Sequence, residues 1–271
     1  MKTRFFQSTL VALALFGQAQ AGAQTTAAFS PPVESNIPDG PQGMAIREGK
    51  KLLTETKQLL PKNVGNGLNC TNCHLNGGAT QGASPWVGIW GVFPEYRSRS
   101  GKLNSLQERV NDCFERSMNG KALAYNSVEM NNILAYMHWL SGGVPTGVNV
   151  QGRGFGAIDN KLLPNAANGK TVFAAKCASC HGAEGQGLKA ATGYAMPPLW
   201  GKDSFNDGAG MARTYTAAAF VKHNMPLGQG GTLSDQDAVD VAEFFTHQSR
   251  PAFAGKSKDW PKGGKPKDAR N

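Results

Sequence analysis

The chain has 271 residues, of which 40% are hydrophobic and 17% are charged. This length suits one large domain or two small ones, and the apolar share excludes wholesale disorder and a collagen-like chain. The 28 basic residues outnumber the 19 acidic ones, but six of the basic residues lie within residues 256–271, so the charge alone does not indicate nucleic-acid binding.

The N-terminus has the form of an export signal. Lys2 and Arg4 precede an apolar run from Ser8 to Phe16, and small residues around Ala21 offer a cleavage site. The run is too short to span a bilayer, and no later segment of the sequence is apolar over a sufficient length. We therefore expect residues 1–21 to be a signal peptide and the mature protein to be periplasmic, without stable membrane insertion.

The sequence CTNCH at residues 70–74 follows an amphipathic helical pattern over residues 45–60. A C-x-x-C-H pentapeptide is the signature of covalent c-type haem attachment. The spacing lets Cys70 and Cys73 each bond one vinyl group of the porphyrin, and His74 is then held beneath the iron as an axial ligand.

The same pentapeptide recurs as CASCH at residues 177–181, after a short helical pattern over residues 168–176. It predicts a second covalent haem on Cys177, Cys180 and His181. A zinc site built from the four motif cysteines would leave both histidines without a role, and a thioredoxin-like site needs only one motif. The cofactors we expect are two haem c groups with their iron.

A glycine-rich loop follows each motif, and each half of the chain ends in an apolar helical pattern, at residues 131–140 and 235–247. This repeat predicts a mainly α fold of two tandem class I cytochrome c-like domains, each with one covalent haem. We expect the first domain at residues 22–148 and the second at 149–255, with a linker at 149–168. Residues 256–271 are predicted to be a basic, disordered tail.

A six-coordinate haem needs a second axial ligand. In the second half, Met225 stands before a proline in a glycine-rich loop, and we predict it as the ligand over Met196 and Met211. In the first half, Met118 matches the spacing of Met225, since each lies 44 residues after the histidine of its motif.

Cys113, 39 residues after His74, is the only cysteine outside the motifs. It is either a buried structural cysteine or a thiolate ligand that can react with sulfur compounds. The residues alone leave Met118 and Cys113 open as the ligand.

With these features the chain resembles the dihaem thiosulfate dehydrogenases, which are similar to the haem-bearing subunit of the periplasmic Sox thiosulfate-oxidising complex. The resemblance rests on both haem motifs, on the segment from Cys113 to Gly120, on the Gly152–Gly154 linker and on the segment from Asn224 to Gly228. It implies an enzyme that couples two thiosulfates into tetrathionate, reversibly in some members.

The resemblance also implies a set of site residues. The first haem is the catalytic one, with His74 and Cys113 as axial ligands, and the second haem, on His181, passes electrons onward. Some members use a lysine just before the methionine position, where this chain has Asn224, so Met225 is the expected ligand. The electrons leave to an external acceptor, a small cytochrome c or a high-potential iron–sulfur protein.

Two thiosulfate dianions must meet to form the new S–S bond, and in a weakly screened site their repulsion costs on the order of several kcal/mol. Their coupling therefore requires fixed cations. The cations near Cys113 in the sequence are Arg97, Arg99, Lys102, Arg109 and Arg116. Guanidinium groups pair well with oxyanions, although a solvated basic face is the alternative interpretation. Similarity to the family favours Arg99 and Arg109 as substrate-binding residues.

Two other functions fit parts of the pattern. The first is a dihaem electron carrier without a substrate, which would not need a reactive cysteine such as Cys113. The second is a Sox-type haem subunit that acts with a partner, although the second haem site here is complete with Met225. A dihaem peroxidase is not supported by the length of the chain.

Overall fold

The computed structural model describes residues 26–270, so the predicted signal peptide at residues 1–21 lies outside them. In chain order the helices are α1 (Gly40–Thr54), α2 (Thr56–Leu59), α3 (Leu75–Gly78), α4 (Leu106–Asp112), α5 (Val128–Leu140), α6 (Ala166–Lys176), α7 (Ala178–His181), α8 (Thr214–Asn224) and α9 (Asp235–Thr246). Two antiparallel hairpins pair β1 (Glu95–Arg97) with β2 (Lys102–Asn104) and β3 (Leu188–Ala190) with β4 (Gly193–Met196). None of the helices within residues 26–270 is long and apolar enough to cross a membrane.

The same helix pair is built twice. Helix α1 packs against α5 in the first half, and α6 packs against α9 in the second. A Cβ atom on Gly49 would lie 1.9 Å from the carbonyl oxygen of Asn132, and one on Gly169 would lie 1.9 Å from that of Asp240. In each half a glycine thus lets the first helix touch the backbone of the last helix. The predicted mainly α fold of two cytochrome c-like domains is confirmed.

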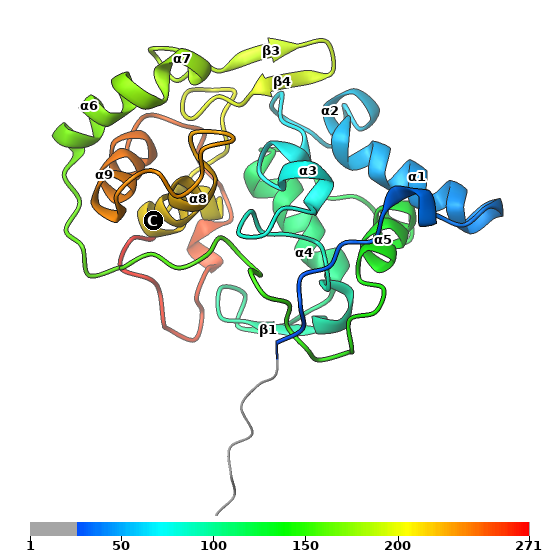
Figure 1. The fold of residues 1–271 in the computed structure, drawn as a ribbon. Coiled ribbons are helices and arrows are strands. Elements are labelled where there is room, and N and C mark those ends of the chain that lie inside the picture. The colour runs from blue at the N-terminus through cyan, green and yellow to red at the C-terminus, as the bar shows by residue number, and fades with distance from the viewer. Residues whose placement is uncertain (1–25, 271) are drawn as a thin grey trace, which may run out of the picture.

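Each helix pair encloses its own hydrophobic core. Ile46 of α1 and Ile133 of α5 are buried in the first core, and Phe173 of α6 and Val239 of α9 are buried in the second. Burial of one such side chain stabilises the fold by roughly 1.5–3 kcal/mol. Figure 1 shows the two halves side by side, with α1 to α5 in one and α6 to α9 in the other.

The helix predicted over residues 45–60 is broken at Glu55, which has φ −119° and ψ 35°. The break turns the chain so that Thr56, at the start of α2, is buried against the first motif. The Thr56 hydroxyl donates to the carbonyl of Leu53 at 3.0 Å and accepts from the amide of Cys70 at 3.1 Å. The interruption therefore positions the first haem-attachment cysteine.

The β3–β4 hairpin of the second half reaches across to the first motif (Figure 1). Its Tyr194 is buried in the core of the first half. The Asn72 side chain donates to the carbonyl of Tyr194 at 2.9 Å, and the Tyr194 amide donates to the carbonyl of Gly67 at 3.2 Å. The two halves are therefore joined at the first haem motif.

The C-terminal segment corrects one prediction. Residues 256–270 pack against the rest of the chain and are not a disordered tail: Trp260 is only 7% exposed. Asp259 pairs with Arg116, and Asp268 pairs with Arg213. The basic composition suggested a solvated end, but the order of the segment comes from these ion pairs with partners far away in the sequence.

Candidate functional site

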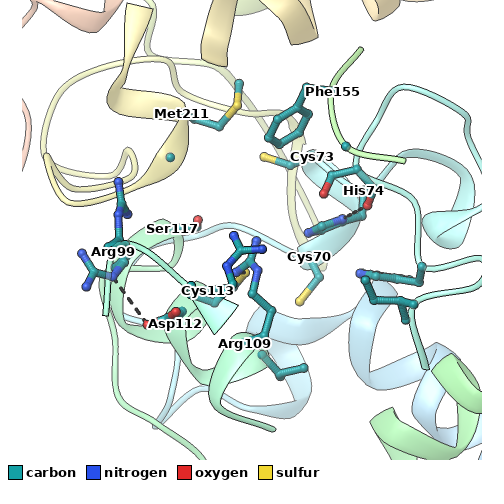
Figure 2. Close-up of a pocket in the computed structure, with 18 of the residues that line it drawn as sticks. Cys70, Cys73, His74, Arg99, Arg109, Asp112, Cys113, Ser117, Phe155 and Met211 are labelled. Carbon is teal, nitrogen blue, oxygen red and sulfur yellow. Dashed lines mark hydrogen bonds and ion pairs between the residues drawn. The ribbon is translucent and has the colours of Figure 1, made fainter. Parts of the chain in front are cut away.

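A cavity of about 860 Å³ lies beside the first C-x-x-C-H motif. Cys70, Cys73 and His74 line it on one side, and Cys113 and Arg109 line it on another. Figure 2 shows these side chains around the same space. The structure therefore brings the predicted attachment residues together with the lone cysteine.

The imidazole of His74 is held in one orientation. Its Nδ1 lies 2.6 Å from the carbonyl oxygen of Ser84, which can only accept, so Nδ1 carries the proton. The ring also stacks on Trp86, with a centroid separation of 4.7 Å. Desolvation lowers the pKa of His74 to about 4 and outweighs its hydrogen bond to Ser84, so the ring is neutral at pH 7. Nε2 is left with its lone pair, as an iron ligand requires.

The histidine of the second motif has the same arrangement. The Nδ1 of His181 lies 2.8 Å from the carbonyl oxygen of Pro197, and desolvation lowers the pKa of its ring. Cys177 packs against the second core, whereas Cys180 is exposed. Both motifs therefore fit covalent haem attachment, with the second attachment point at the protein surface.

Met225 directly follows α8 and packs against the second core, as Cys177 does. The preceding Asn224 is buried, and its amide donates to the carbonyls of Gly82 and Phe220 at 2.9 and 3.0 Å. Met211, a weaker candidate for the second ligand, lines the cavity of the first motif. Met225 is therefore placed with the second motif, and Met211 borders the space beside the first.

Cys113 begins a single π-helical turn, Cys113–Ser117, at the end of α4. Ser105 caps the start of α4 in a capping box with Glu108, which fixes the direction of the helix. Such π-helical turns are frequent at functional sites. The Nη1 of Arg109 donates to Sγ of Cys113 at 3.0 Å, so the sulfur is held at the cavity wall by a cation.

Met118, the alternative ligand, also borders the cavity but is only 2% exposed and belongs to the first core. Its sulfur lies 4.0 Å from Sγ of Cys70. Met118 thus packs in the first core, although it lies as far after His74 as Met225 lies after His181.

Among residues 26–270, six arginines and two carboxylates line the cavity, an excess of positive charge that suits an anionic ligand. The arginines are Arg97, Arg99, Arg109, Arg116, Arg153 and Arg213, and the carboxylates are Glu95 and Asp112. Lys102, which lies among the predicted cations in the sequence, is exposed and pairs with Glu108 at 2.6 Å. Arg153 and Arg213 were not predicted because they come from the linker and from the second half.

Most of these arginines have acidic partners. Glu95 pairs with Arg97 at 2.8 Å and with Arg153 at 2.9 Å. Arg109 forms no ion pair with a carboxylate within residues 26–270. The charge of Cys113, more than any other group, raises the pKa of Arg109. Arg109 is therefore a cation whose main contact is the cavity sulfur.

Comparison with known proteins assigns a family to each half. The family model for the SoxA/TsdA cytochrome c domain matches residues 58–146, and the cytochrome c model matches residues 166–249. A thiosulfate dehydrogenase from Psychrobacter arcticus is 53% identical over 257 residues, which cover 93% of this chain and 79% of the relative. One from Allochromatium vinosum is 45% identical, covering 87% of this chain and 89% of the relative.

A solved structure is similar over most of the chain. Thiosulfate dehydrogenase (TsdBA) from Marichromatium purpuratum superposes with a TM-score of 0.79 at 36% identity. The match covers 83% of this chain and 50% of that chain, so this protein spans half the length of that solved chain.

Proposed function

The chain belongs to the thiosulfate dehydrogenase family of cytochromes c with two covalent haems, and on this premise we propose that it oxidises two thiosulfates to one tetrathionate in the periplasm. The observation that carries this proposal is the contact of Arg109 with Cys113 in a cavity lined by arginines. A substrate-free electron carrier needs neither the free sulfur nor the excess of cations.

The arginines serve to bind and screen the substrate. Thiosulfate carries its charge on sulfonate oxygens, which pair well with guanidinium N–H groups. Arg99 and Arg109 line the cavity from different elements, so two dianions can be held against different cations. This arrangement offsets the repulsion between the dianions, which is on the order of several kcal/mol in a weakly screened site.

Cys113 acts as the sulfur-transfer residue, in two steps. In the first, the Cys113 thiolate and the terminal sulfur of one thiosulfate form an S–S bond and give up two electrons. In the second, another thiosulfate attacks that terminal sulfur and displaces Cys113 as thiolate, as in thiol–disulfide exchange. The sum converts two thiosulfates into one tetrathionate and two electrons, and no proton is gained or lost.

The two haem groups supply the acceptors for these electrons. The residues that would hold the first haem are Cys70, Cys73 and His74 with Cys113, and those for the second are Cys177, Cys180 and His181 with Met225. Because Cys180 is exposed, the second site offers an exit to an external acceptor. A small cytochrome c or a high-potential iron–sulfur protein suits this role.

Replacement of Cys113 by glycine tests the proposal. The variant is expected to carry both haems and to lose thiosulfate-dependent ferricyanide reduction, because the sulfur acceptor of the first step is gone. Met118→Leu is the matched control, since it removes a different sulfur that lines the cavity and is expected to keep turnover. Full activity of Cys113→Gly would contradict the proposed role of this residue.

A further inference from the structure

The C-terminal segment, residues 251–270, follows α9 along the second half (Figure 1), and its Asp259 pairs with Arg116 of the first half. The Asp207 carboxylate anchors its beginning, accepting from the Phe253 amide at 2.7 Å and from Nζ of Lys256 at 2.5 Å. Further on, the Trp260 amide donates to the carbonyl of Arg99 at 2.7 Å. Trp260 and Pro266 of this segment line the cavity.

The segment is basic, yet its two acidic residues are the buried ones. The side chains of Asp259 and Asp268 are 5% and 7% exposed, respectively. Each pairs with an arginine that lines the cavity: Asp259 with Arg116, and Asp268 with Arg213 at 3.1 Å. Buried carboxylates are costly unless they are paired, so this placement indicates a specific role for both acids.

Asp259 contacts two cavity arginines at once. Its carboxylate accepts from Nη1 and Nη2 of Arg116 at 2.9 and 2.8 Å, which is a bidentate pair, and it lies 3.8 Å from Nε of Arg99. Desolvation, followed by the nearby charge of Arg116, lowers the pKa of Arg99 to about 10, and Asp259 opposes this effect. The shared carboxylate therefore lets two partly buried cations lie next to each other.

The same segment also covers the faces of the two guanidinium groups. Arg99 lies 4.9 Å above the ring of Trp260, and Arg116 lies 4.3 Å above the ring of Phe253. Both arginines also donate from Nη1 to the carbonyl of Gly208, at 2.7 and 3.2 Å. Each guanidinium is thus held by an acid, an aromatic ring and a backbone carbonyl before any ligand arrives.

We infer that Asp259 is a positioning residue for substrate binding, which holds Arg99 and Arg116 in a fixed orientation at the cavity. This inference rests on the proposed function. Guanidinium groups ordered in advance bind a dianion without the entropy cost of fixing two long side chains. Thiosulfate and other tetrahedral dianions are therefore recognised by the first half and the C-terminal segment together.

The test compares Asp259→Asn with wild-type holoprotein in thiosulfate-dependent ferricyanide reduction. The KM for thiosulfate is expected to rise about tenfold, with kcat changed less than about threefold, because binding and not chemistry loses its support. Asp39→Asn, which removes the same charge at an exposed position, is the control and is expected to leave KM unchanged. Asp259→Glu, which keeps the charge, is expected to recover part of the loss.

Binding of sulfate to the oxidised holoprotein, measured by calorimetry, gives a readout without turnover. Asp259→Asn is expected to weaken sulfate binding by about the same factor as KM. An unchanged or lower KM together with unchanged sulfate affinity overturns the inference, even where wild-type protein turns over thiosulfate. If sulfate binding weakens in Asp259→Asn but the wild-type protein does not oxidise thiosulfate, the proposed function alone is refuted.

If Asp259→Asn does not fold with both haems, Asp268→Asn provides the second test. It removes the counter-ion of Arg213 in the same way, and a smaller rise in KM in the same direction is expected. Unchanged KM and sulfate affinity in that folded variant would count against the positioning role of the segment.

Discussion

The Nη1 of Arg109 donates to Sγ of Cys113 at 3.0 Å, and the two residues lie one helical turn apart where α4 passes into the π-helical turn. This contact places a fixed cation directly at the sulfur of Cys113. In our proposal this sulfur bonds to one thiosulfate in the first step and leaves as a thiolate in the second. The contact also holds that sulfur on the cavity side of the chain.

Arg109→Gln should therefore impair catalysis. We expect kcat/KM for thiosulfate to fall about a hundredfold, because a charge-assisted contact at the reacting atoms is lost. Steady-state ferricyanide reduction measures the effect. Lys102→Gln, which removes a nearby charge that does not line the cavity, is the matched control. If both substitutions lowered kcat/KM equally, the loss would come from the overall positive charge, and the proposed contact of Arg109 with the reacting sulfur would be contradicted.

The ligand assignments predict opposite spectra for two methionine variants. Met225→Leu is expected to remove the methionine–iron charge-transfer absorption of the oxidised protein, because the second haem loses its thioether ligand. Met118→Leu should retain that band and the spectrum of the first haem. It should cost less than about 1.5 kcal/mol in stability, because it is a volume-conserving change in a core. A changed first-haem spectrum in Met118→Leu would refute the ligand role of Cys113.

The helix contacts at Gly49 and Gly169 leave no room for a methyl group. A Cβ on either residue would lie 1.9 Å from a backbone carbonyl oxygen, so Gly49→Ala and Gly169→Ala force the helix pairs apart. We expect each to destabilise its half by about 2 kcal/mol or more, seen as a drop of several degrees in melting temperature. Gly210→Ala, where the nearest atom lies at 4.0 Å, is the control and should change the melting temperature little.

Acid should weaken the link between β1 and the linker. Desolvation opposes the ionisation of Glu95, but hydrogen bonds and charge from Arg97 and Arg153 outweigh it, so the pKa of Glu95 is lowered. A lowered folded-state pKa contributes stability that is present above the ordinary pKa, about 4.3, and is lost as pH falls through the folded value. The wild-type advantage in melting temperature over Glu95→Gln should therefore shrink below about pH 4.3. A constant difference between pH 7 and pH 3 would contradict this account.

The haem sites could be predicted from the sequence because the covalent chemistry fixes their spacing. Cys70, Cys73 and His74 must lie within one pentapeptide to reach one porphyrin, and the same holds for the motif at residues 177–181. Resemblance to the thiosulfate dehydrogenase family is confirmed by relatives of 45% and 53% identity. The repeat of two domains follows from the same local patterns.

The cavity wall could be predicted only in part. Of the five cations that lie near Cys113 in the sequence, four line the cavity, namely Arg97, Arg99, Arg109 and Arg116, whereas Lys102 faces solvent. Arg213 and Trp260 come from the second half and the C-terminal segment, so only tertiary packing brings them to the first motif. The order of that segment depends on pairs such as Asp259 with Arg116, and composition carries no sign of such pairs.

The measurement that tests the central claim most directly is the stoichiometry of thiosulfate-dependent ferricyanide reduction by the haem-loaded protein. We expect one tetrathionate to appear for every two thiosulfates consumed and every two ferricyanides reduced. No thiosulfate-dependent reduction, in protein whose two haems are both reduced by dithionite, would contradict it and favour an electron carrier or a subunit that requires a partner.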